Sequence, residues 1–124
     1  AEAGLNSRGE GEGAAEVLLR RGERPTGIFS ASDMIALGVM ECARRRGLRI
    51  PEDLALVGFD DIELASFAGL TTVRQPMQEM GRTAAEIVTR LMQGDKIRRI
   101  SRQLPVELIV RESCGATARR EEGG

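Results

Sequence analysis

Histidine, tryptophan and tyrosine are absent from this chain. Without histidine there can be no serine–histidine or cysteine–histidine catalysis and no histidine metal site. The two cysteines, Cys42 and Cys114, match no metal-binding spacing, and Cys42 is expected to be a small buried residue of an apolar helix. No apolar run approaches the roughly 18 residues that a membrane span needs, and no signal segment is recognised. We therefore expect a cytoplasmic protein that does not associate with membranes.

The chain also has no large excess of positive or negative charge. The chain has 18 basic and 19 acidic residues among 124, for a net charge of −1. This balance leaves no general electrostatic footprint for nucleic acid. The densest basic run, residues 44–46, falls at a predicted helix C-terminus, where cations interact favourably with the helix dipole. A phosphate-binding patch is the less favoured interpretation of this run.

Short apolar runs, breakers and helical spacing predict strands that alternate with helices. Helices are predicted at 13–21, 33–46, 62–67 and 77–92, and strands at 26–31, 54–59, 70–74 and 103–110. This alternation indicates an α/β fold with a mainly parallel sheet. Ser32 is placed to cap the second helix, and Asp33 lies favourably in its first turn. Phe29 and Phe59 are expected to point into the core of the sheet.

Polar side chains follow two of the predicted strands where each strand ends. Ser32 and Asp33 follow the first strand, and Asp60 and Asp61 follow the second. Ligands of open parallel sheets bind just beyond the carboxyl ends of the strands. We therefore predict one half of a polar small-molecule site, with the other half outside this chain. From the residues alone, Asp60 could equally be a ligand-binding carboxylate or the cap of the turn at Ile62.

Paired carboxylates at a strand end also suit Mg²⁺. An enzyme or phosphoacceptor that uses Asp60 and Asp61 with magnesium is therefore an alternative. No general acid and no phosphate-binding glycine loop accompanies the pair, so this alternative is not favoured. We expect no catalytic residues, no resident metal and no cofactor.

A series of short motifs extends through most of the chain. They are SDMIALG (32–38), GLRIPED (47–53), VGFDD (57–61), LTTVRQP (70–76), GRTAA (81–85) and LPVELIVRES (104–113). In this order they resemble the lactose-repressor/galactose-repressor (LacI/GalR) family of bacterial transcriptional regulators. The resemblance covers roughly residues 13–113.

The resemblance implies a periplasmic-binding-protein-like (type I) sensor domain of parallel-sheet α/β class, present as an incomplete fragment. Residues 1–12 would be a flexible stump and 111–124 a disordered tail. Residues 13–74 would form the later part of the C-terminal effector-binding subdomain, and 75–110 the crossover strands plus a helix of the N-terminal subdomain. The implied function is to sense a sugar or related metabolite for a regulator whose helix-turn-helix, outside this chain, binds operator DNA. A fragment of a periplasmic-type sugar-binding protein is the main alternative.

The resemblance also implies individual roles at the effector site. Asp60 matches the family's effector-binding aspartate, and Ser32 stands where many relatives have an asparagine that contacts ligand. Gln75, at the crossover, is a third candidate. For Ser32 the helix cap remains an equally good interpretation. Asp33 and Asp61 are assigned mainly structural roles.

Leu37, Met40 and Phe67 lie where relatives bury a subunit interface, so the resemblance implies a homodimer. A plain core role is the alternative for Met40. Because the sheets would be incomplete, unpaired edges should make the isolated chain self-associate or be marginally stable.

Overall fold

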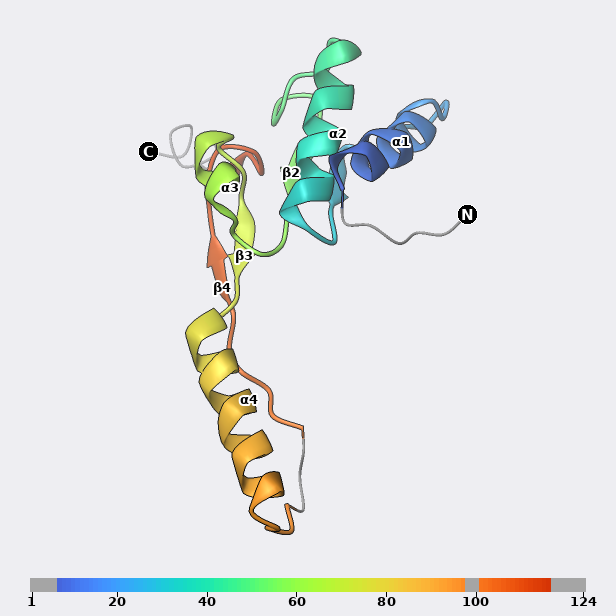
Figure 1. Cartoon of the computed structure of the whole chain (residues 1–124). Helices are drawn as coiled ribbons and strands as arrows, with labels where there is room; N and C mark the ends of the chain where they lie inside the picture. The colour runs from blue at the N-terminus through green and yellow to red at the C-terminus, as the bar shows by residue number, and fades with distance from the viewer. Residues whose placement is uncertain (1–6, 98–100, 117–124) are drawn as a thin grey trace. The chain divides into compact units, whose positions relative to one another are not determined.

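The computed structural model describes residues 7–97 and 101–116 and divides the chain into two units (Figure 1). The first unit comprises Ala1–Arg74 and Leu108–Gly124, and the second unit comprises Gln75–Glu107. The chain therefore leaves the first unit after Arg74 and returns to it at Leu108.

Helices and strands follow the predicted order. They are α1 (Arg8–Leu19), β1 (Gly27–Phe29), α2 (Asp33–Arg45), β2 (Ala55–Val57), α3 (Glu63–Phe67), β3 (Thr72–Arg74), α4 (Met77–Met92) and β4 (Glu107–Ile109). The helices match the prediction closely except at the start of α1, and the strands are shorter than predicted. Among the described residues, no helix is long and apolar enough to span a membrane.

The pairings of β1 with β2 and of β2 with β3 are parallel. β1 and β2 are parallel, with Ile28 opposite Leu56. Isolated parallel bridges join Val57 to Thr71 and Asp60 to Arg74, which brings β3 alongside β2, and β4 pairs with β3. The predicted α/β class with a mainly parallel sheet is confirmed.

The core of the first unit lies between this sheet and its helices. Its buried apolar residues are Ala15, Leu19, Ala36, Val39, Cys42, Ala43, Leu54, Leu56, Ala65 and Leu70. The core residues of α1 and α2 are mostly alanine or cysteine because α1 packs closely on α2. A Cβ atom at Gly38 would collide with the backbone carbonyl of Arg8, and one at Gly11 with the carbonyl of Ile35. Glycine at these two positions lets the two helix backbones approach each other.

Helix α1 begins at Arg8, so the predicted flexible stump is wrong for residues 8–12. The Ser7 hydroxyl caps the helix by accepting a hydrogen bond from the Glu10 N–H at 3.2 Å. Glycines in this stretch lower intrinsic helix propensity, which is why the sequence suggested a loop. Packing on α2 outweighs that propensity. Residues 1–6 of the predicted stump lie outside the described residues.

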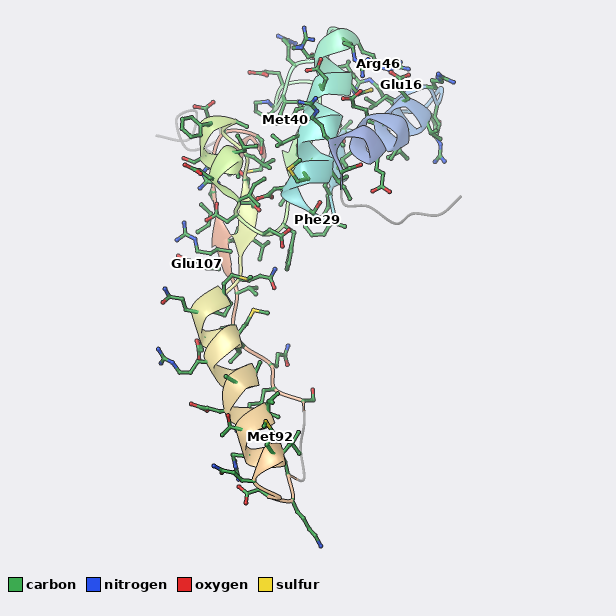
Figure 2. All side chains as sticks on the ribbon, viewed as in Figure 1. Glu16, Phe29, Met40, Arg46, Met92 and Glu107 are labelled. Atoms are coloured by element: carbon green, nitrogen blue, oxygen red, sulfur yellow. The ribbon has the colours of Figure 1, made fainter. Side chains whose placement is uncertain are left out.

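Charged pairs border the contact between α1 and α2. Arg45 pairs with Glu12 at 2.6 Å. Arg46 pairs with Glu16 at 2.8 Å, and Figure 2 labels both residues. Between them Cys42 is fully buried, as predicted, and its thiol donates to the Glu16 carboxylate at 3.3 Å. Burial raises the pKa of the Cys42 thiol. This cysteine is therefore a packing residue that stays protonated.

Phe29 is 66% exposed, which corrects its predicted place in the core. Within β1 only Ile28 is partly covered, while Gly27 and Phe29 on either side of it are exposed. Side chains alternate between the two faces of the strand, and the described elements cover only the face that carries Ile28. Phe59 is half-buried.

The predicted disordered tail is wrong for its first residues. Ser113 is only 2% exposed, and its hydroxyl donates to the Leu56 carbonyl at 2.6 Å while accepting from the Thr71 N–H at 2.8 Å. The Leu56 N–H in turn donates to the Ser113 carbonyl at 2.8 Å. Ser113 thus adds a hydrogen-bonded link between the β2 and β3 segments beside their direct bridge at Val57 and Thr71. Residues 117–124 lie outside the described residues.

Helix α4 of the second unit is amphipathic but has no buried residue. Its exposed apolar side chains are Met77, Met80, Val88, Leu91 and Met92. Figure 2 labels Met92 near the end of the helix. A single helix of this length is marginal in water unless its apolar face packs on something. The helix therefore requires a further surface that the described residues do not provide.

We expect the 124-residue chain to self-associate through this face. Replacing both Val88 and Leu91 by glutamate should weaken self-association at least tenfold, because each apolar side chain stabilises a contact by about 1.5–3 kcal/mol when buried. Sedimentation velocity over a concentration series would measure the change. Arg90→Glu, a charge change at a neighbouring position, is the control. A wild-type chain that sediments only as a 13.4 kDa monomer would contradict this expectation.

The turn that leads into β2 carries an ion pair with a measurable pH signature. Asp53 accepts from the Arg49 guanidinium at 3.0 Å and from the Arg49 N–H at 2.8 Å. These hydrogen bonds lower the pKa of Asp53 to about 2. A depressed pKa in the folded state means that the pair stabilises the fold above the ordinary pKa near 3.8 and stops doing so as the pH falls towards 2.

A carboxyl-carbon NMR titration of Asp53 should therefore show a midpoint near pH 2. In the Arg49→Gln variant the midpoint should return towards the ordinary value, because the guanidinium donors are gone. An unchanged midpoint in that variant would show that the pair does not set the pKa.

Candidate functional site

The loop that follows β2 carries both acidic candidates in an unusual backbone conformation. Asp60 has φ = 122° and Asp61 has φ = 56°, both in a region that L-residues other than glycine rarely adopt. Such conformations cost about 1–3 kcal/mol each, and they persist only where surrounding contacts hold them. They concentrate at ligand sites, which makes this loop the leading site in the first unit.

Contacts with β3 hold the loop in place. The Asp60 N–H donates to the Val73 carbonyl at 2.9 Å, and the Asp61 N–H donates to the Thr72 hydroxyl at 3.3 Å. Asp60 itself is half-buried. The backbone of β3 therefore determines where the Asp60 carboxylate lies.

Asp33 ties helix α2 to the same loop. It is fully buried, and one carboxylate oxygen accepts from the Thr72 hydroxyl at 2.6 Å while the other accepts from the Ile62 N–H at 2.9 Å. Its own N–H donates to the Phe59 carbonyl at 2.9 Å. Both carboxylate oxygens are engaged within the protein, so Asp33 is structural.

Ser32 is the cap of α2, as predicted. It is 2% exposed, and its hydroxyl accepts from the Ile35 N–H at 3.2 Å. The hydroxyl proton remains for a further acceptor. The structure thus places Ser32 and Asp60 at the ends of the neighbouring strands β1 and β2, while contact of either residue with an effector stays a prediction.

Asp61 is bound by two arginines. Its carboxylate pairs with Arg74 at 2.7 Å and with Arg111 at 3.0 Å. Burial raises the pKa of Asp61, but the hydrogen bonds from both guanidinium groups outweigh that effect and hold the pKa below its ordinary value. Asp61 is therefore ionised and engaged with both arginines at neutral pH.

Gln75 belongs to the second unit, of which it is the first residue. Its backbone carbonyl accepts from the Met77 N–H at 2.9 Å at the start of α4. Its predicted contact with an effector stays a prediction.

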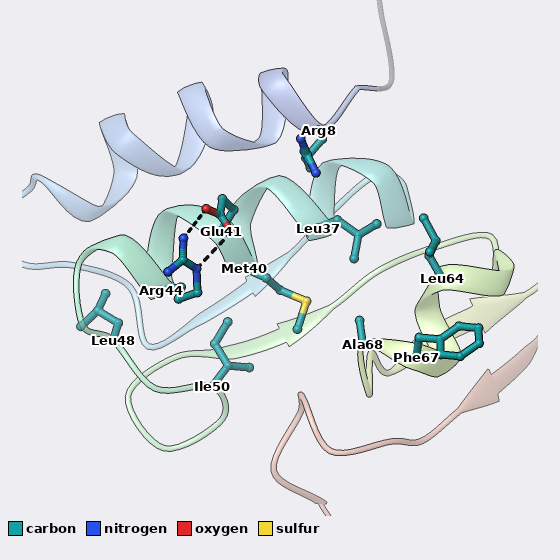
Figure 3. Close-up of a pocket in the computed structure, with 10 residues that line it drawn as sticks. All are labelled: Arg8, Leu37, Met40, Glu41, Arg44, Leu48, Ile50, Leu64, Phe67 and Ala68. Atoms are coloured by element: carbon teal, nitrogen blue, oxygen red, sulfur yellow. Dashed lines mark hydrogen bonds and ion pairs between the residues drawn. The ribbon is translucent and has the colours of Figure 1, made fainter.

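The three residues predicted at a subunit interface line one apolar groove of about 600 Å³ in the first unit (Figure 3). Phe67 is 84% exposed at the end of α3, and Leu37 and Met40 reach the groove from α2. The other lining residues are Arg8, Glu41, Arg44, Leu48, Ile50, Leu64 and Ala68. Such a large exposed aromatic beside an open apolar groove is typical of a surface that packs against another molecule.

Several important residues gave no signal in the sequence. Arg74, Arg111 and Ser113 stood in the family-like motifs, but nothing in their spacing indicated that they would meet Asp61 or bridge strands. Ser30 is 3% exposed at the end of β1, and among the described residues its hydroxyl finds no hydrogen-bond partner. The only sequence signal for a buried Ser30 hydroxyl was its position two residues before Ser32.

Among the described residues, no group of three or more cysteine, aspartate or glutamate side chains is arranged to hold a metal ion. The carboxylate oxygens of Asp61 pair with Arg74 and Arg111.

A parallel α/β unit whose strand ends carry a strained acidic loop, joined by two crossings to a second unit, is characteristic of part of a two-unit small-molecule-binding domain. The sequence matches the model of the periplasmic binding protein-like domain family over residues 2–114. The chain belongs to this family, in the form found in LacI-family transcriptional regulators.

Similar proteins are transcriptional repressors. The HTH-type transcriptional repressor CytR of Escherichia coli (strain K12) is 43% identical over 108 residues, which cover 86% of this chain and 32% of the repressor. A CelR–cellobiose complex has a TM-score of 0.80 and 34% identity, over 86% of this chain and 33% of CelR. The lac repressor dimer bound to operator and an anti-inducer has a TM-score of 0.78 and 32% identity, over 87% of this chain and 33% of the lac repressor chain. This chain thus spans about a third of the length of the curated relatives it matches.

Proposed function

We propose that this chain is the later part of the effector-sensing domain of a LacI-type DNA-binding transcriptional regulator. The observation that carries the proposal is the strained Asp60 loop, held at a strand end by β3, in a chain similar to repressors over most of its length. Residues 13–74 form the later C-terminal subdomain, and 75–110 supply crossover strands and one helix of the other subdomain.

Asp60 is the principal effector-binding residue in this proposal. A fixed carboxylate can accept hydrogen bonds from two vicinal hydroxyls, and each such charged hydrogen bond is worth about 1.5–3 kcal/mol. Ser32 and Gln75 contribute further polar contacts. The effector is therefore a sugar or a related polyhydroxy metabolite, consistent with cellobiose in the similar CelR complex.

The proposal includes a cytoplasmic homodimer. Leu37, Met40 and Phe67 make the subunit interface, supported by the apolar groove that they line. Operator DNA is bound by a helix-turn-helix outside this chain, so the chain alone should not bind DNA. The similar lac repressor structure is a dimer bound to operator.

The alternatives have less support. Similarity to repressors over 86% of the chain favours a regulator over a periplasmic sugar-binding protein. A magnesium enzyme would need both carboxylates, and Asp61 is already paired with Arg74 and Arg111. We therefore propose that the chain is not an enzyme.

Reading the coding DNA upstream of Ala1 tests the proposal. We expect one open frame that encodes a helix-turn-helix followed by the remaining part of the binding domain. An intact upstream frame that encodes neither would remove the DNA-binding half of the mechanism and overturn the proposal.

A further inference from the structure

Both crossings between the units have an arginine on the side of the first unit. Arg74 is the last residue before the chain leaves that unit, and Arg111 lies just after the chain returns at Leu108. The two arginines are far apart in the sequence, yet both guanidinium groups bind the same carboxylate, that of Asp61. Asp61 follows directly after Asp60 in the chain.

The contacts of Asp61 are well shielded. Its side chain is 10% exposed and that of Arg111 is 19% exposed, so solvent screens this pair less than a surface pair. Arg111 is itself held in place, because it also donates to the Leu70 carbonyl at 2.9 Å and its N–H donates to the Thr71 hydroxyl at 2.9 Å. The contact between Arg111 and Asp61 is therefore held in a fixed geometry. The Arg74 side chain, which makes the other contact, is about half exposed.

The backbone at Asp60 and Asp61 needs such an anchor. Two successive residues with positive φ would relax to ordinary conformations if nothing held them. The N–H groups of both residues bond to β3, and the Asp61 carboxylate adds bonds to the arginine that ends β3 and to the arginine that follows β4. The segment after β2, the strand β3 and the segment after β4 are thus joined at Asp61.

We infer that Asp61 is a positioning residue of the effector site: by binding Arg74 and Arg111 together it fixes the Asp60 carboxylate relative to both crossings. The inference rests on the proposed effector role of Asp60. In this arrangement Asp61 does not touch the effector, and any movement of Asp60 on binding is transmitted to the segments that lead to the second unit.

Hydrogen exchange of the 124-residue chain tests the anchor without any effector. Asp61→Asn should speed exchange of the Asp60 and Arg111 amides at least tenfold while leaving the amides of α1 and α2 within about twofold. Arg74→Gln, which changes a more exposed side chain, should speed exchange of the Asp60 amide and leave exchange of the Arg111 amide unchanged. Asp53→Asn, which breaks a comparable pair with Arg49 elsewhere in the first unit, is the matched control and should leave Asp60 unchanged. Faster exchange throughout the first unit, or no change at Asp60, would overturn the inference.

A double-mutant cycle tests whether Asp61 acts through Asp60. In the intact regulator, with cellobiose, ribose and a ribonucleoside as probes, Asp61→Asn should weaken binding about tenfold in the wild-type background. In the Asp60→Asn background it should have less than a twofold effect. Equal effects in both backgrounds would overturn the positioning role. If no probe binds the wild-type regulator, the proposed function is in doubt, while the exchange experiment still decides whether the anchor exists.

Discussion

Alanine at position 58 is expected to destabilise the first unit strongly. Gly58 is buried directly after β2, and a Cβ atom there would collide with the Asp33 carboxylate and lie 3.0 Å from the Leu70 side chain. Gly58 is not among the glycines with positive φ, so the backbone itself would accept alanine. The effect therefore comes from the collision alone.

The collision is costly because Asp33 cannot move freely. Overpacking a core costs about 1–3 kcal/mol. Displacing the Asp33 carboxylate would also break its bonds to Thr72 and the Ile62 N–H, and an uncompensated buried charge costs about 3–5 kcal/mol. We expect a loss of at least about 3 kcal/mol, a large part of the stability of a small domain. Gly58→Val, with a bulkier side chain, should be worse.

Urea unfolding of the chain, followed by circular dichroism, would measure this change. Gly13→Ala is the control, because a Cβ atom there meets nothing within 4 Å and alanine favours the helix. The control should be as stable as the wild type or more so. A Gly58→Ala variant with wild-type stability would show that the Asp33 network is not as rigid as the structure indicates.

Asp60→Asn is expected to remove most of the effector response of the intact regulator while the fold persists. The substitution keeps the size of the side chain and one acceptor oxygen but removes the charge. Losing one charged hydrogen bond costs about 1.5–3 kcal/mol, which corresponds to a roughly 10- to 150-fold weaker affinity. Asparagine tolerates positive φ about as well as aspartate, so the backbone should not change.

Calorimetric titration with polyhydroxy probes such as cellobiose and ribose would measure this loss. Asp60→Gly supplies the complementary control. It relieves the strained φ of 122° and removes the carboxylate, so the protein should still fold and yet fail to respond. An Asp60→Asn variant that binds its effector normally would return Asp60 to the role of a turn cap.

Much of the fold could be predicted because local signals agreed with one another. Apolar runs bounded by Pro25, Gly47, Pro76 and Gly94 defined the order of the elements, and Ser32 marked the start of α2. The exposure of Phe29 could not be predicted, because it depends on which face of β1 the rest of the protein covers. The start of α1 was missed because contact between helices, which no local propensity contains, makes glycine favourable at Gly11.

The site could be predicted only in outline. Strand ends carrying Ser32 and Asp60 follow from the α/β pattern and from the family-like motifs. The contact of Asp61 with Arg111 joins residues 50 positions apart, and no spacing rule indicates such a pair. The positive φ values of Asp60 and Asp61 were equally hidden, because they arise from hydrogen bonds to β3 and not from the residue types.

The most direct test of the central claim is the affinity of the intact regulator for DNA from its own promoter, measured by fluorescence anisotropy with and without polyhydroxy probes. We predict that the intact protein binds the DNA and that one probe changes this affinity at least about fivefold, within the usual range of allosteric coupling. The 124-residue chain alone should bind neither the DNA nor the probe tightly. Tight sugar binding by the chain alone, or an intact protein that does not bind DNA, would contradict the account.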